Sequence, residues 1–270
     1  MDGILLIDKQ SGKTSHDVVA AIRKKIGVKK VGHTGTLDPL ATGLLVLCVG
    51  KATRLVEFME SHDKEYEATI RLGRRTETDD REGKIIREEP VTLTEAEILS
   101  NLSDLTGTLE QIPPRYAAIK KDGKKLYQYA RAGEEVSVPA RTVRVDQFEL
   151  LEWTPPLFRA RIACSKGTYI RALARDLGGS LEELRRTATG PFRIENAQKE
   201  NEELTWLPLD SGISSLPKVE ISDQERALWQ IGKDLSQTCE APLVRIYANN
   251  RFLGIGEKTE TGIHPRKVFS

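Results

Sequence analysis

Residues 32–45, GHTGTLDPLATGLL, hold a single carboxylate, Asp38, in a segment rich in glycine and threonine. Glycine allows left-handed backbone conformations and a close approach of the chain to a ligand. Pro39 fixes its own φ angle and biases Asp38 toward an extended conformation. An apolar run, residues 44–49, follows directly. We therefore expect a stiff loop that holds one acid at the mouth of a buried strand, as carboxylate catalysis requires.

The same residues also allow a simpler interpretation, because Asp-Pro is a common turn dipeptide and Asp often caps turns in polar loops. Other catalytic patterns do not occur in the sequence. The four histidines lack ligand spacing, residues 76–83 lack the spacing of a calcium loop, and Ser165 lies outside a nucleophile elbow. Neither a Walker A motif nor a dinucleotide fingerprint is found. We therefore expect an enzyme that needs no cofactor and no metal.

The composition is that of an ordinary globular protein: of 270 residues, 39% are hydrophobic and 30% are charged. No run of about 18 apolar residues is present, so we expect no membrane span. The N-terminal segment lacks the cationic start of a signal peptide. The three cysteines are far apart, which suits neither a disulfide framework nor a zinc site. We expect a protein of the reducing cytoplasm.

Charge is distributed unevenly although the net charge is only +1. Basic residues outnumber acidic ones in segments 1–54, 115–144 and 158–193, whereas acidic residues dominate segment 57–104. The basic segments could converge on a phosphate-binding face. The alternative is that they are simply the solvated faces of helices and strands.

Hydrophobic periodicity and turn residues place the secondary structure. The predicted strands are residues 3–7, 44–49, 64–72, 141–153 and 157–164, with further short strands within 241–258. The predicted helices are 15–26, one ending at 59, one that starts at either Thr92 or Thr94 and ends near 107, 126–132, one capped by Thr168, and 181–187. This irregular mixture favours an α+β fold. A polar linker predicts two domains, residues 1–212 and 213–270.

The stretch Gly35-Thr36-Leu37-Asp38-Pro39-Leu40-Ala41-Thr42-Gly43 resembles the signature loop of the TruB family of tRNA pseudouridine synthases. Further segments resemble that family in order along the chain: 7–15, 64–83, 113–133, 165–178 and 184–192. Residues 251–256 and 264–269 resemble parts of a PUA domain, an RNA-binding module. The resemblance implies a mixed, largely antiparallel central sheet flanked by helices, with a small C-terminal β-rich PUA-like domain.

By this resemblance the chain isomerises uridine 55 in the T loop of tRNA to pseudouridine. Residues 113–136 look like part of the RNA-gripping insertion of stand-alone members, which argues against a guide-dependent synthase and implies that the tRNA T stem-loop is bound without a guide RNA. We expect a monomer, because no heptad pattern occurs. Gln10 stands where the family has Pro, and the chain between Gly178 and Leu184 is shorter than usual. These departures motivate an alternative, a catalytically silent protein that binds or folds tRNA on the same scaffold.

The resemblance also implies roles for individual residues. Asp38 is the catalytic carboxylate, either as nucleophile or as base at the ribose. Arg171 pairs with Asp38, and Tyr66 stacks on the uracil of a nucleotide flipped out of its helix.

Four more residues complete the implied substrate site. Tyr169 hydrogen-bonds near the base, and Leu184 forms a wall of the pocket. His33 presses into the space left by the flipped nucleotides, and Lys9 contacts phosphates.

Overall fold

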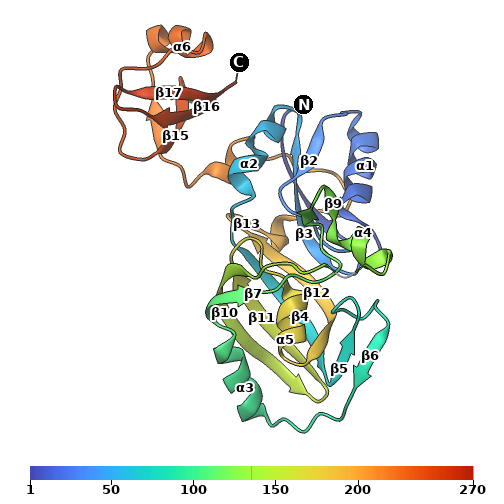
Figure 1. Ribbon diagram of the computed structural model, residues 1–270. Helices are drawn as coiled ribbons and strands as arrows, with labels where there is room; N and C mark the ends of the chain where they lie inside the picture. Colours follow the sequence, from blue (N-terminus) through green and yellow to red (C-terminus); the bar gives the residue numbers. More distant parts are fainter. Residues whose placement is uncertain (135, 270) are drawn as a thin grey trace.

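The computed structural model describes residues 1–134 and 136–269, so that Glu135 and Ser270 lie outside the described residues. A nine-stranded sheet runs through the larger part of the chain (Figure 1). Its strands, in spatial order, are β1 (Gly3–Lys9), β3 (Thr42–Val49), β12 (Gly179–Thr189), β4 (Lys64–Leu72), β11 (Leu157–Cys164), β10 (Arg141–Thr154) and β7 (Gly107–Gln111), with β2 (Val31–His33) beside β3 and β13 (Phe192–Arg193) beside β12.

One pairing in this sheet differs from the others within it. Strands β3 and β12 are parallel over two residue pairs, Thr42 with Arg185 and Gly43 with Arg186, whereas the remaining pairs are antiparallel. This short contact joins a first part of the sheet, β1 to β3, to a second part, β12 with β4, β11, β10 and β7. The predicted α+β fold with a largely antiparallel sheet is confirmed.

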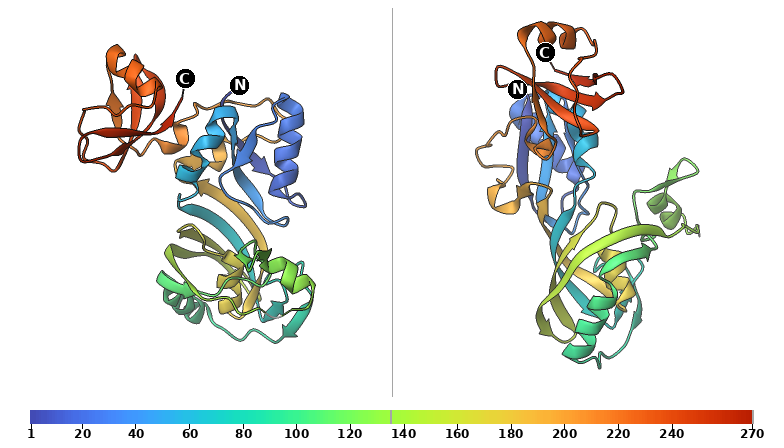
Figure 2. Two further views of the ribbon diagram at one scale, coloured as in Figure 1. Left: turned by 45° about the horizontal axis from the view of Figure 1, so that its top comes forward. Right: turned by 90° about the vertical axis from the view of Figure 1, so that its left-hand side faces the viewer.

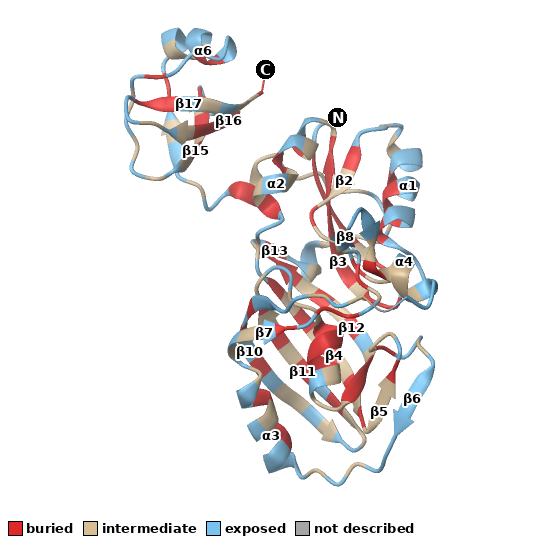
Figure 3. Ribbon diagram, in the orientation of Figure 1, coloured by how far each residue is buried: buried red, intermediate tan, exposed pale blue. Residues whose placement is uncertain are grey.

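Three helices, α1 (Ser15–Ile26), α3 (Glu95–Asp104) and α5 (Ile170–Asp176), cover one face of the sheet and share its main apolar core. Strand β4 alternates as predicted, with Tyr66, Ala68, Ile70 and Leu72 buried in that core. A second core lies on the other face of β1 and β3, under η1 (Gly50–Leu55) and α2 (Val56–Met59). Figure 3 shows buried residues along the strands of both parts of the sheet.

Helix α1 has the ends that the sequence predicts. Thr14 is its N-cap, and the Thr14 hydroxyl accepts a hydrogen bond from the backbone N–H of Asp17 while the Asp17 carboxylate accepts one from that of Thr14. Gly27 ends the helix in the left-handed conformation, with φ of 69°. The helix therefore begins and ends where it does for local reasons, which fixes the buried Ser15 at its first position.

Two short hairpins and a helix extend from the second part of the sheet. They are β5 (Arg74–Thr76) with β6 (Ile85–Glu88), and β8 (Lys120–Lys121) with β9 (Lys124–Lys125), which leads into α4 (Leu126–Arg131). Turns η2 (Ile194–Asn196) and η3 (Ser211–Ile213) lie on the way to the C-terminal part.

The C-terminal residues form a separate β-rich domain at one end of the molecule (Figure 2). Its elements are β14 (Lys218–Glu220), α6 (Asp223–Gln230), β15 (Leu243–Ala248), β16 (Arg251–Lys258) and β17 (Ile263–Val268). Trp229 lies fully buried in its own apolar core. The domain contacts η1 and α2, because Arg54 stacks 4.8 Å from the Phe269 ring centre and Lys267 lies 2.7 Å from Glu57. Over the described residues, no helix is long and apolar enough to cross a membrane.

Two local predictions are wrong. Residues 181–187 form part of strand β12 and not a helix. A bulge between Leu181 and Glu183 lets Leu181 and Leu184 both pair with inward-facing residues of β4, and this spacing of three imitates a helical pattern. Thr168 does not cap α5, because that helix begins at Ile170 with Tyr169 as its N-cap residue.

A substitution at Gly43 tests how closely β3 and β12 must pack where the two parts of the sheet meet. Gly43 has φ of +99°, and a Cβ atom added there would lie 2.3 Å from the carbonyl oxygen of Arg186. We expect Gly43→Ala to lower the free energy of unfolding in urea by about 3 kcal/mol or more, since backbone strain and overpacking combine. The control Gly12→Ala has a similar φ of +84° but open space around it, and it should cost about 1 kcal/mol. Equal losses would contradict the packing argument.

Candidate active site

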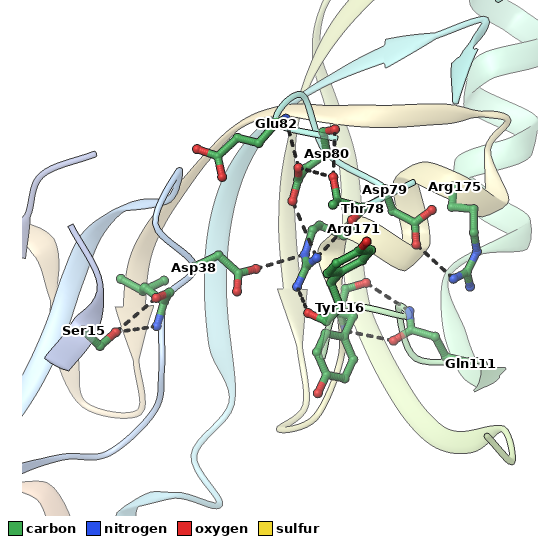
Figure 4. A network of polar contacts seen from close by, with 12 residues as sticks. Ser15, Asp38, Thr78, Asp79, Asp80, Glu82, Gln111, Tyr116, Arg171 and Arg175 are labelled. Carbon is green, nitrogen blue, oxygen red and sulfur yellow. Dashed lines mark hydrogen bonds and ion pairs between the residues drawn. The ribbon is translucent and has the colours of Figure 1, made fainter. Parts of the chain in front are cut away.

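Asp38 lies in the segment between β2 and β3, here called the Asp38 loop (residues 34–41). The backbone N–H of Ala41 donates to the carbonyl of Asp38 at 3.1 Å and closes a turn. The hydroxyl of Ser15 lies 2.8 Å from the N–H and 3.1 Å from the carbonyl oxygen of Leu37, and it fixes the residue before the acid. The Asp38 side chain is 40% exposed. The predicted stiff display of one accessible carboxylate agrees with this geometry (Figure 4).

The Lys9 ammonium group holds the other side of the loop. Its Nζ donates to the carbonyls of Gln10, Pro39 and Ala41, at 3.0, 3.2 and 2.5 Å. Lys9 has no exposed surface, and burial lowers its pKa to about 8. The predicted contact of Lys9 with phosphates is therefore wrong, because a side chain without accessible atoms cannot reach RNA. The Lys9 ammonium group instead donates hydrogen bonds to backbone carbonyls of the loop.

Arg171 connects the loop to the second part of the sheet. Its Nε lies 3.0 Å from Oδ2 of Asp38, and this contact is an ion pair without the alignment of a hydrogen bond. The same guanidinium donates to the carbonyls of Thr78 and Tyr116, at 3.0 and 3.2 Å. The Arg171 side chain is only 6% exposed. Arg171 therefore presents a fixed positive charge to Asp38, as the resemblance implied.

Asp80 is a site residue for which sequence reasoning assigned no role. Its carboxylate lies 3.5 Å from Nη1 of Arg171 and is as buried as the guanidinium. It accepts hydrogen bonds from the Thr78 hydroxyl at 2.6 Å and from the backbone N–H of Glu82 at 3.0 Å. Figure 4 shows the Arg171 guanidinium joined to both acids, with Asp80 above it and Asp38 to its left. Asp80 thus compensates the buried charge and leaves Asp38 accessible.

Tyr169 and Tyr66 both lie close enough to Asp38 for its charge to act on their hydroxyl groups. Gln111 fixes the Tyr169 backbone, whose N–H donates to the Gln111 amide oxygen at 2.8 Å and whose carbonyl accepts from its nitrogen at 3.2 Å. Burial raises the pKa of Tyr169. Tyr66 is 7% exposed on β4, opposite Arg186 of β12, and burial raises its pKa to about 12. Both phenols are therefore protonated at neutral pH.

His33 and Leu184 border the site from β2 and β12. The His33 ring packs edge-on against His16, with 5.7 Å between ring centres, and burial lowers the pKa of His33 so that the neutral form dominates. Leu184 and Leu40 line one cavity of about 520 Å³, with Arg81 and Arg185 also in its wall. Asp38 and Arg171 do not line this cavity, so the role of Leu184 as a wall of the substrate pocket stays a prediction.

The site combines an exposed carboxylate, a buried guanidinium and two protonated phenols. Such a carboxylate can attack or deprotonate a sugar and can stabilise positive charge on it, as in glycoside chemistry. Within the described chain, no group of three or more His, Cys, Asp or Glu side chains is placed to hold a metal ion.

Comparison with protein families identifies the chain. The model described as the TruB family pseudouridylate synthase N-terminal domain matches residues 23–170. The model described as the pseudouridine synthase II TruB C-terminal domain matches residues 217–269. The chain belongs to the TruB family. The resemblance predicted from the motifs is confirmed.

Individual relatives agree with this assignment along the whole chain. The tRNA pseudouridine synthase B of Aromatoleum aromaticum is 44% identical over 287 aligned residues, which cover 100% of this chain and 93% of the relative. That of Trichormus variabilis is 42% identical, with 100% and 99% coverage. Among solved structures, a Cbf5-Nop10-Gar1 complex matches with a TM-score of 0.74 and 26% identity, over 99% of this chain and 85% of the other. The predicted pseudouridine synthase fold is confirmed.

The role of Lys9 in this TruB family site is testable through stability. Lys9→Met removes the donor for two loop carbonyls, and we expect it to lower the free energy of unfolding by about 2–4 kcal/mol, because buried acceptors lose their partner. The control is Lys13→Met, whose side chain is 49% exposed in an ion pair with Glu200 and should cost less than about 1 kcal/mol. Urea unfolding followed by circular dichroism measures both. Equally small losses of stability in the two variants would contradict the conclusion that Lys9 holds the Asp38 loop.

Proposed function

We propose that this chain converts uridine 55 in the T loop of tRNA to pseudouridine, without a guide RNA. One observation carries the proposal: in the TruB family loop, an exposed Asp38 lies 3.0 Å from the buried guanidinium of Arg171. A carboxylate in this setting faces solvent on one side and a fixed positive charge on the other. It can therefore meet the sugar of a nucleotide that enters from the open side.

In the proposed reaction the bond between N1 of uracil and C1′ of ribose breaks, and a bond between C5 and C1′ forms. C5 loses its proton and N1 gains one, so no atom need be supplied from outside. Asp38 acts at the sugar, as nucleophile or as base, and stabilises positive charge at C1′. The uracil rotates within the pocket between the two bonding steps. No cofactor takes part in this scheme.

The neighbouring residues position the nucleoside in this proposal. Tyr66 stacks on the uracil, and Tyr169 hydrogen-bonds near the base. Leu184 forms the wall beside the Asp38 loop. His33, being neutral, enters the space that the flipped nucleotide leaves in the RNA, where an apolar ring face can replace a stacked base.

The remaining parts bind the tRNA T stem-loop. We infer a catalytic domain of residues 1–212 and a PUA-like RNA-binding domain of residues 213–270, since the family models also divide between 170 and 217. The basic hairpin β8–β9 is positioned to contact phosphates, because Lys120, Lys124 and Lys125 lie on its short strands. We propose a monomer. The three free cysteines suit the reducing cytoplasm.

The decisive experiment uses a T-stem-loop RNA tritiated at C5 of uracil, because isomerisation releases that tritium to water. We expect wild type to release it without added guide RNA. Asp38→Asn keeps the size of the side chain but removes its charge, and it should slow release at least about 10³-fold while the Kd for the RNA changes less than about threefold.

Two outcomes would contradict the proposal. No release by excess wild-type enzyme would rule out the synthase activity. If wild type and Asp38→Asn then refolded misfolded tRNA equally well, the chain would instead be a tRNA-folding protein on the same scaffold.

A further inference from the structure

Arg186 is a second buried arginine at the site, and none of the roles above includes it. Its side chain is among the largest that are fully buried, with 2% relative exposure. In the sheet it pairs with Tyr66 of β4 on one side and with Gly43 of β3 on the other. Arg186 therefore lies at the joint between the two parts of the sheet, because its strand β12 runs between β4, which carries Tyr66, and β3, which follows the Asp38 loop.

The guanidinium of Arg186 holds the backbone on both sides of Asp38. Its Nη2 donates to the carbonyl of Gly35 at 3.1 Å, and its Nε donates to the carbonyl of Leu44 at 2.7 Å. Tyr66 is the register partner of Arg186 on β4, and the Arg186 charge lies close enough to the Tyr66 phenol to oppose the rise in its pKa that burial causes. One planar, rigid group thus contacts the backbone before the acid and the backbone after it, on the strand position that faces Tyr66.

The charge of Arg186 is unusual for a buried group. Within the part of the chain that the structure describes, Arg171 pairs with Asp38 and Asp80, but no carboxylate forms an ion pair with Arg186. Burying a cation without an anion is costly unless its donors are satisfied. Burial is the main cause that lowers the pKa of Lys9, His33 and Lys64, and the charge of Arg186 lowers all three further. A long apolar side chain could fill the same space at lower cost.

We propose that Arg186 is a positioning residue that couples Asp38 to Tyr66, by holding the backbone of the Asp38 loop on a guanidinium that lies beside the Tyr66 phenol. The inference rests on the proposed synthase activity. It implies that a lysine cannot replace Arg186, since a single ammonium group on a flexible chain lacks the rigid, separated donors that reach the carbonyls of Gly35 and Leu44. It also implies that the effect of Arg186 on the reaction passes in part through the Tyr66 hydroxyl.

A double-mutant cycle tests this coupling. Single-turnover tritium release and RNA Kd are measured for wild type, Arg186→Lys, Tyr66→Phe and the double variant. We expect Arg186→Lys to slow release about 100-fold in the wild-type background, as a misplaced catalytic group does, with the Kd changed less than about threefold. In the Tyr66→Phe background the same change should add less than about tenfold, because the hydroxyl that it serves is gone.

The matched control is Arg161→Lys, since Arg161 pairs with Glu149 on the outer, exposed face of β11 and should leave release unchanged. Three results would overturn the inference: an unchanged rate for Arg186→Lys, effects that multiply fully in the double variant, or a rate loss matched by an equal rise in Kd.

Folding is checked by circular dichroism. If Arg186→Lys fails to fold, Arg186→Gln, whose amide can still donate to a loop carbonyl, enters the same cycle. Failure of both to fold would also overturn the inference, because Arg186 would then serve the fold itself. Absence of release by wild type would instead count against the proposed function, so the two failures are distinguishable.

Discussion

The Asp38 loop has no regular secondary structure between β2 and β3, so its peptide groups must find hydrogen-bond partners outside a sheet or helix. Side chains from three separate elements supply them: Lys9 of β1, Ser15 of α1 and Arg186 of β12. All three are buried. The position of the acid therefore depends on the packing of the whole first part of the sheet and on its joint with the second part.

The two carboxylates around Arg171 have different tasks because they differ in exposure. Asp80 is 6% exposed and hydrogen-bonded by Thr78, so it fixes the guanidinium and offsets the cost of burying it. Asp38 is 40% exposed and leaves part of its surface free. A single ion pair with Asp38 would have been screened by solvent, whereas the buried partner holds the arginine in place whether or not a substrate is present.

How much could be predicted from sequence depends on how local the determinants are. The caps of α1 and the alternation of β4 follow from neighbouring residues, and both were predictable. The strand β12 was not, because a bulge gives Leu181 and Leu184 a helical spacing. Lys9 was misassigned because lysine is usually exposed, and only the fold reveals the carbonyls around it. The role of Arg186 follows from a strand register that no local pattern encodes.

The site residues are divided between the two parts of the sheet. The short β3–β12 contact between these parts therefore affects how the site residues lie relative to one another. Asp38 belongs to the first part, whereas Arg171, Tyr66 and Tyr169 belong to the second. In the strand order, β3 meets β12 through two residue pairs, and Gly43 must lie against the Arg186 backbone there. A side chain at Gly43 would push the two parts of the sheet apart and with them the acid from its arginine. The glycine of the loop motif is thus required by the same contact that sets the distance from Asp38 to Arg171.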